Sequence, residues 1–167
     1  MNKYFNEAQK NNGEKFRKQV NSLKFNFYLL AKLPAAYFSG VRLVNLTEES
    51  CKVKIPFKWF SQNPFRSTYF ACLAMAAEMS TGLPCMMAIV KMNPKVSMLV
   101  VNLESSFTKK ASDVTTFECL DISAIYDAVH KAIQTKEGQL VETHSIGINN
   151  AGDEVARFKI TWSFKSR

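Results

Sequence analysis

The sequence lacks several patterns that would assign a chemistry directly. It has no glycine-rich phosphate loop, no HExxH zinc motif, no GxSxG nucleophile motif and no internal repeat. It has only two histidines, His130 and His144, and neither shows metal-ligand spacing with the four cysteines. The sequence therefore predicts no metal site.

The cysteines also show no pattern of a secreted protein. Residues 1–12 are too polar for a secretory signal, and the four cysteines form no CxxC pair: Cys51, Cys72, Cys85 and Cys119. Disulfide frameworks are typical of secreted chains. The longest apolar runs are shorter than a membrane span requires. We therefore expect reduced thiols, a cytoplasmic location and no transmembrane segment.

Acidic residues are outnumbered by basic ones. The 22 lysines and arginines against 14 acids give a formal net charge of +8. Such a balance favours anionic partners: nucleic acid, a membrane surface or a phosphorylated small molecule. Nucleic acid is the least favoured, because aromatic and basic residues do not alternate as in a base-stacking platform. The 167 residues, 47% of them hydrophobic, predict one domain, residues 1–167.

Apolar spacing predicts a long helix at the start, over residues 5–33, which Pro34 ends. The apolar stripe of this helix recurs at steps of four and three: Phe16, Val20, Leu23, Phe27 and Leu30. We expect the stripe to dock on the core, so that residues 1–34 form a packed N-terminal helical segment. The alternative is that the stripe covers a partner or a membrane surface.

The stretch after residue 63 predicts the central helix. From residue 67 to residue 82 its only charged residue is Glu78, and Gly82 and Pro84 are expected to end it. Because its apolar residues do not gather on one side, we expect burial on all sides. Residues 85–92 fit either a short helix or a strand, and a helix is favoured.

Alternating apolar residues predict strands in the remaining sequence, with one amphipathic helix over residues 123–138. The predicted strands are residues 40–49, 50–57, 96–110, 113–122, 139–149 and 154–165. This order predicts an α+β fold. An antiparallel sheet of about six strands would curve around the central buried helix, with the N-terminal helix added to it.

This layout resembles the hot-dog fold, and residues 63–82 resemble the active-site helix of hot-dog thioesterases, which act on small acyl-CoA esters. In one branch the helix begins with Gln or Asn, Pro-Phe-Gly and His-Gly-Gly, and a catalytic acid follows nine residues after the His. The matching residues here are Asn63, Pro64, Phe65 and Glu78. The differing residues are Arg66 for glycine and Tyr69, Phe70 and Ala71 for His-Gly-Gly. Residues 107–111 and 152–156 also resemble family motifs.

The resemblance implies hydrolysis of an acyl-CoA or acyl-carrier thioester. Glu78 would be the general base or the nucleophile, and the backbone amides of Phe70 and Ala71 would form the oxyanion hole. Tyr69 could hydrogen-bond the substrate carbonyl, and Asn63 could orient that carbonyl or a water.

The resemblance also implies how the substrate and a second chain are held. Arg66, Lys109 and Lys110 are candidates for the coenzyme A phosphates. Coenzyme A enters only as part of the substrate, and no other cofactor is expected. The family implies a homodimer, joined through the strand at residues 96–110, or a dimer of dimers.

Two alternatives stay open at this point. Glu78 could be a structural acid paired with Arg66, a lysine or Tyr69. The chain could also be a non-catalytic hot-dog protein that binds acyl thioesters or lipids, because the His-Gly-Gly motif is missing.

Overall fold

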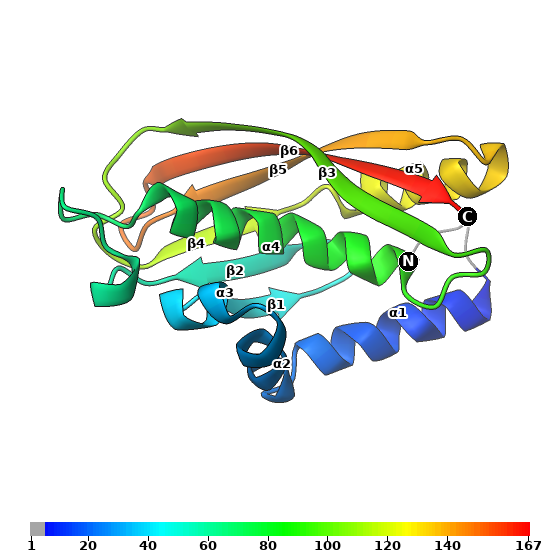
Figure 1. Cartoon of the computed structure of the whole chain (residues 1–167), viewed down its shortest axis with the longest axis horizontal. Coiled ribbons are helices and arrows are strands. Elements are labelled where there is room, and N and C mark those ends of the chain that lie inside the picture. Colours follow the sequence, from blue (N-terminus) through cyan, green and yellow to red (C-terminus); the bar gives the residue numbers. More distant parts are fainter. Residues whose placement is uncertain (1–5) are drawn as a thin grey trace.

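The computed structural model describes residues 6–167, and it has the mixed α+β architecture that the sequence predicts (Figure 1). The helices are α1 (Glu7–Val20), α2 (Lys24–Lys32), α3 (Pro34–Ser39), α4 (Phe70–Ile89) and α5 (Ile122–Thr135), with a short 3-10 turn η1 (Trp59–Ser61). The strands are β1 (Arg42–Leu46), β2 (Cys51–Ile55), β3 (Val96–Phe107), β4 (Thr115–Cys119), β5 (Gln139–Ile148) and β6 (Glu154–Ser166). All six predicted strands are confirmed.

The strands form one antiparallel sheet in the order β1-β2-β4-β5-β6-β3. β3 pairs with β6 from Val96–Ser166 to Phe107–Ala156, so one edge of this long strand is paired and the other is open. The sheet curves around α4, which lies against its inner face (Figure 1).

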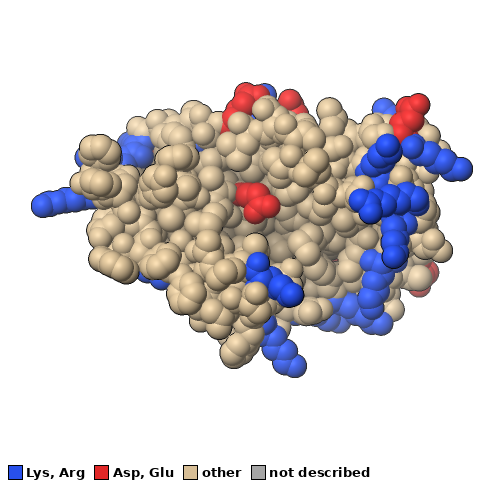
Figure 2. Space-filling view, in the orientation of Figure 1, with Lys and Arg blue, Asp and Glu red and all other residues tan. Residues whose placement is uncertain are grey.

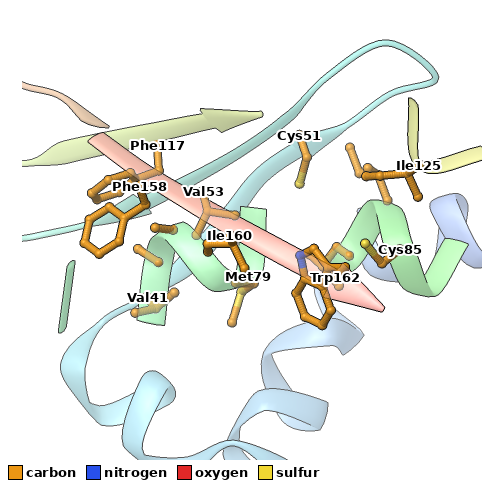
Figure 3. Packing of buried hydrophobic residues seen from close by; sticks show 14 of the residues in the cluster. Val41, Cys51, Val53, Met79, Cys85, Phe117, Ile125, Phe158, Ile160 and Trp162 are labelled. Atoms are coloured by element: carbon orange, nitrogen blue, oxygen red, sulfur yellow. The ribbon is translucent and has the colours of Figure 1, made fainter. Parts of the chain in front are cut away.

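Side chains from the inner face of the sheet form the core (Figure 3). The alternation predicted for the last strand is confirmed, because its inward residues are all buried: Ala156, Phe158, Ile160, Trp162 and Phe164. The ring of Phe158 meets that of Phe117 edge to face, with centroids 5.6 Å apart. α5 covers a further part of the core with Ile125 and Val129.

The predicted single N-terminal helix is wrong. Residues 21–23 separate α1 from α2. The predicted end is confirmed, since α2 ends at Lys32 just before Pro34, and Pro34 then begins a further helix, α3. Proline is tolerated in the first turn of a helix, because a backbone amide there has no helical carbonyl to donate to. The predicted start at residue 5 lies outside the described residues.

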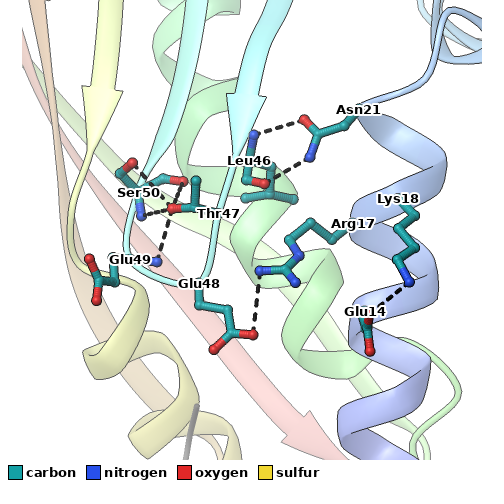
Figure 4. Close-up of polar contacts among 9 residues, drawn as sticks. All are labelled: Glu14, Arg17, Lys18, Asn21, Leu46, Thr47, Glu48, Glu49 and Ser50. Atoms are coloured by element: carbon teal, nitrogen blue, oxygen red, sulfur yellow. Dashed lines mark hydrogen bonds and ion pairs between the residues drawn. The ribbon is translucent and has the colours of Figure 1, made fainter.

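Asn21 explains the break (Figure 4). Its side-chain amide donates to the Leu46 carbonyl oxygen at 2.8 Å, and its Oδ1 accepts from the Leu46 amide at 2.9 Å. These bonds pair the helix end with the outer edge of β1. Arg17 adds an ion pair with Glu48 at 3.3 Å. The N-terminal segment therefore packs on the sheet as predicted. The first half of the predicted stripe does contact the core, because Val20 is buried and Phe16 packs against it. The second half does not: Leu23, Phe27 and Leu30 are exposed, and α2 buries Phe25 and Leu29 instead.

The predicted end of the central helix is also wrong. α4 continues through Gly82 and Pro84 to Ile89, and this confirms the helix favoured for residues 85–92 up to that point. Pro84 costs one helical hydrogen bond. The helix continues because Cys85, Met87 and Ala88 are buried in the core, and that burial offsets the lost bond.

α4 is not buried on all sides. One stripe of the helix is open or half-open to solvent and includes Phe70, Ala74, Met75, Glu78 and Met86. By length and composition α4 could cross a membrane, but 72% of its apolar window is buried within the fold, as in the core helix of a globular protein. We call the exposed stripe the open face of α4.

Candidate active site

Glu78 lies midway along the open face of α4. Figure 2 shows a single acidic group in a hollow of the uncharged surface over α4, and Glu78 is the only acid of that helix. Within residues 6–167 no hydrogen bond or ion pair reaches its carboxylate, so the pairing with Arg66, a lysine or Tyr69 is not formed. Glu78 is therefore an acid without a structural partner.

The surroundings of Glu78 are apolar, and the resulting loss of hydration raises its pKa. Its side chain still reaches solvent. Gly82 lies one turn further along, where a Cβ would stand 3.6 Å from Glu78 Oε1. An accessible carboxyl group with a raised pKa is suited to proton transfer near neutral pH.

The Glu78 backbone is held from the sheet side. The Thr81 hydroxyl donates to the Glu78 carbonyl oxygen at 3.1 Å and accepts a hydrogen bond from Trp162 Nε1, also at 3.1 Å. This link fixes the middle of α4 against β6. The sequence pattern marked Trp162 only as a core residue, and it gave no signal for Thr81.

A second feature, a pocket of about 470 Å³, lies where α4 begins and β3 ends. Its walls include five predicted site residues: Asn63, Tyr69, Phe70, Lys109 and Lys110. The Thr68 amide and hydroxyl both donate to the Ala111 carbonyl oxygen, at 2.8 and 3.0 Å, and thereby join the two walls. Sequence analysis did not assign Thr68, Leu73 or Phe107 to this pocket.

The start of α4 presents two backbone amides that no helical carbonyl can accept. Phe70 and Ala71 occupy the first two helical positions, and no side chain caps this end. The next amide, that of Cys72, donates to the Tyr69 carbonyl oxygen at 2.9 Å. The partial positive charge of a helix start favours a developing anion, so these amides are available for the predicted oxyanion role.

Asn63 organises the loop before the helix. Its Oδ1 accepts from the Phe65 amide at 2.9 Å and the Ser67 amide at 3.2 Å, and its Nδ2 contacts the Ser67 hydroxyl at 3.0 Å. The side chain thus closes an Asx turn. Its predicted role in orienting substrate or water stays a prediction.

Tyr69 stands at the N-cap position of α4, half-exposed in the pocket wall. Its ring packs edge to face on that of Phe70, with centroids 4.9 Å apart. In the described part of the chain, no protein group hydrogen-bonds its hydroxyl. The hydroxyl is therefore free to meet a ligand, as the predicted role requires.

The three basic candidates differ in their surroundings. Lys109 forms an ion pair with Asp153 at 2.9 Å, and Lys110 Nζ lies 3.5 Å from the Phe65 carbonyl oxygen. Arg66 is exposed with a φ of 57° and does not line the pocket. Lys110 is therefore the candidate best placed to meet an anion at the pocket.

Glu78 does not line the pocket. Glu78 stands eight positions after Phe70, which is about 12 Å along the helix axis at 1.5 Å per residue. A carbonyl group held by the first amides of α4 is therefore out of reach of Glu78 in the same chain. Within one chain, Glu78 and the backbone amides of Phe70 and Ala71 therefore lie apart.

No group of three or more His, Cys, Asp or Glu within residues 6–167 is arranged to hold a metal ion. The four cysteines are buried and free. Burial raises the pKa of Cys119 to about 12, so this thiol stays protonated near neutral pH.

Several solved structures have the same fold. A Pseudomonas aeruginosa protein of unknown function aligns at 15% identity with a TM-score of 0.73, over 92% of this chain and 95% of that one. The thioesterase HI1161 of Haemophilus influenzae aligns at 10% identity with a TM-score of 0.61, over 82% and 86% of the two chains. A glutamine-to-alanine variant of a P. aeruginosa thioesterase aligns at 11% identity with a TM-score of 0.65, over 90% and 94%.

These similarities show the hot-dog fold that the sequence resemblance implied. No curated protein matches the chain. The sequence profile of a family described as a domain of unknown function (DUF4442) matches residues 24–164. The chain therefore belongs to the DUF4442 family, with the hot-dog fold.

Proposed function

We propose that this protein is a hydrolase of small-molecule acyl thioesters, with coenzyme A or an acyl carrier as the thiol component. The observation that carries the proposal is the unpaired carboxylate of Glu78, with a raised pKa, on the open face of an otherwise uncharged helix. An unpaired acid in an apolar setting lowers the stability of the fold, so its presence there points to a functional role. The fold shared with the two thioesterases supports the same reaction class.

The chemistry follows from the two halves of the site. The thioester carbonyl would accept hydrogen bonds from the Phe70 and Ala71 amides, and Tyr69 Oη could donate a third. Glu78 would remove a proton from water as the water oxygen attacks the carbonyl carbon. The oxyanion then re-forms the carbonyl, the C–S bond breaks, and the thiolate leaves and takes up a proton. Direct attack by Glu78, followed by hydrolysis of an anhydride, is the variant of this step.

The site needs two chains. Because Glu78 lies about 12 Å along the helix from its own oxyanion amides, we propose that each carboxylate serves the amides of a partner copy. The open edge of β3 is suited to this pairing: it exposes Leu99, Val101 and Leu103. A long exposed apolar edge strand is otherwise prone to aggregation. Homodimer formation through β3, alone or within a dimer of dimers, would bring the two α4 helices together.

The substrate thiol would lie against the basic side of the pocket. Lys110 would contact the phosphates of coenzyme A at the pocket, and Arg66 would contact them from outside it. Lys109 would contact them after breaking its ion pair with Asp153. No further cofactor enters this reaction. We also propose a cytoplasmic setting, in which the four free thiols would stay reduced.

One observation favours a second function, binding without turnover. Phe70, whose amide would bind the oxyanion, carries a half-exposed ring at the place where the related enzymes have glycine. A side chain there could keep the thioester carbonyl from reaching the amides.

The two functions are separated by assaying thiol release from short, aromatic and long acyl-CoAs, alongside binding of the same compounds by calorimetry. Hydrolysis that Glu78→Gln abolishes supports the hydrolase. Binding of acyl-CoA by the wild type without any thiol release supports the binding function.

A further inference from the structure

Exposed apolar side chains gather on α2, α3 and η1, and α3 packs against both of the other elements. These side chains project into solvent: Leu23 is 84% exposed, Trp59 81% and Phe27 73%. We call this surface the α2–η1 face, and it comprises Leu23, Phe27, Leu30, Leu33, Phe38, Trp59 and Phe60. Exposed apolar patches of this kind mark interaction surfaces.

The face is built on ordered structure. Leu23, Phe27 and Leu30 recur at steps of four and three, so they form one stripe of α2 on the side away from buried Phe25 and Leu29. The second half of the stripe that the sequence marked thus faces outward, whereas its first half, Phe16 and Val20, packs on the core.

Aromatic contacts join α3 to η1. The ring of Phe38 lies 5.9 Å from that of Phe60, which lies 6.2 Å from that of Trp59. Gly40 ends α3 with a φ of 87°, and a Cβ there would stand 2.8 Å from Pro56 Cγ. This close approach holds the end of α3 against the segment that leads into η1.

The charges around the face are of one sign. Lys24, Lys32 and Lys58 are exposed at its rim. The sequence has no acid from residue 15 to residue 47, nor from residue 50 to residue 77. Figure 2 shows basic but no acidic side chains around α2, at the lower edge of the view. The face therefore combines projecting aromatic side chains with uncompensated positive charge.

From this combination we propose that the α2–η1 face docks on an anionic lipid bilayer. The aromatic and leucine side chains enter the interface between headgroups and acyl chains, where tryptophan is favoured. Lys24, Lys32 and Lys58 lie at headgroup level and contact the lipid phosphates. The bilayer is bound from the side, and α4 stays inside the fold.

A second copy of the chain fits this face less well. A two-fold interface brings the same patch of both chains together, so it would place the lysines of one chain against those of the other. The α2 part of the face follows α1, which is hydrogen-bonded to β1, the strand at the end of the sheet opposite β3. The bilayer proposal is therefore independent of the proposed dimer and of the proposed hydrolase activity.

Vesicle co-sedimentation of the full chain tests the proposal. The probes are vesicles of phosphatidylcholine alone and of phosphatidylcholine with about a third phosphatidylglycerol, a composition that gives an anionic surface. We expect binding to the anionic vesicles only. Phe27→Ser with Trp59→Ser should weaken it at least about tenfold, because two large apolar groups no longer enter the interface. The matched control, Leu120→Ser with Leu140→Ser, removes two equally exposed leucines elsewhere and should bind like the wild type.

A second pair of variants tests the charges. Replacing Lys24, Lys32 and Lys58 by glutamine should weaken binding, by about fivefold for each lysine. The control replaces Lys131, Lys136 and Lys165, which are exposed outside the face, and should have a smaller effect. All variants alter exposed side chains, and circular dichroism checks their folding.

Three results would overturn the proposal: no binding of the wild type to anionic vesicles, equal loss in the variants and their controls, or dissociation of a dimer by Phe27→Ser with Trp59→Ser. The last result would assign the face to a second copy of the chain.

Discussion

Gly147 in β5 offers a sharp test of the packing between the sheet strands. A Cβ at this position would lie 2.6 Å from Phe117 Cε1, 2.7 Å from Phe117 Cζ and 3.0 Å from Thr115 Cγ2. Non-bonded carbons prefer about 3.5–4.0 Å, so the overlap with the ring is about 1 Å. The Phe117 ring is fully buried and in edge-to-face contact with Phe158, so it cannot move without displacing the core.

We therefore expect Gly147→Ala to lower the free energy of unfolding by about 1–3 kcal/mol, the usual cost of overpacking a core. For a chain of this size, this corresponds to a fall in Tm of about 2–4 °C per kcal/mol. Urea and thermal unfolding measure both quantities. Gly138→Ala is the matched control, because a Cβ there has nothing within 4 Å and its φ is not left-handed. It should be neutral or slightly stabilising. Equal effects of the two substitutions would refute the packing of Phe117 against Gly147.

Three further predictions concern Glu78, the N-terminal segment and the proposed dimer. Folding raises the pKa of Glu78 above 4.5, so the folded chain binds this proton more tightly than the unfolded chain does. The free energy of unfolding of the wild type should thus fall as the pH rises from about 4.5 through the raised pKa. Glu78→Gln should lack this pH-dependent loss and be more stable than the wild type at neutral pH. Identical pH profiles of the two proteins in urea unfolding would contradict this. Asn21→Ala removes both hydrogen bonds to the Leu46 backbone and should lower the free energy of unfolding by about 1–3 kcal/mol. An unchanged midpoint of urea unfolding would exclude the anchoring role of Asn21. Leu99→Lys on the open β3 edge should shift the chain from dimer to monomer in sedimentation analysis, whereas an unchanged mass would place the interface elsewhere.

The strand pattern was most predictable where a strand has one buried face, as β2, β4 and β6 do. Alternation in β2 and β6 follows directly from this, and the order of strands and helices was enough to indicate the α+β class. The resemblance of residues 63–82 to an active-site helix then supplied the hot-dog fold, which the solved structures confirm.

The helix boundaries were harder to predict, because local signals compete with burial. Gly82 and Pro84 read as stops, yet the buried residues that follow keep α4 helical to Ile89. Asn21 read as one more polar residue of a long helix, whereas its bonds to Leu46 end that helix. Both outcomes depend on contacts between segments far apart in the chain.

The candidate site was partly predictable. The position of Glu78 in the family pattern identified it, but the open face of α4 that exposes it follows from which side of the helix the sheet covers. The separation of Glu78 from the Phe70 and Ala71 amides follows from helix geometry. The anchoring of the Glu78 backbone through Thr81 and Trp162 had no sequence signal, because both side chains are ordinary core residues in isolation.

The most direct test of the proposed hydrolase is thiol release from acyl-CoA by the wild type and by Glu78→Gln, measured at saturating and at low substrate. We predict that Glu78→Gln lowers kcat/KM by about 10²–10⁴-fold, as expected for loss of a general base, with little change in acyl-CoA binding. Mixing Glu78→Gln with a second inactive variant that blocks the helix start, Ala71→Pro, should restore part of the activity if the site is shared between two chains. Thiol release by Glu78→Gln at the wild-type rate would contradict the proposed role of Glu78.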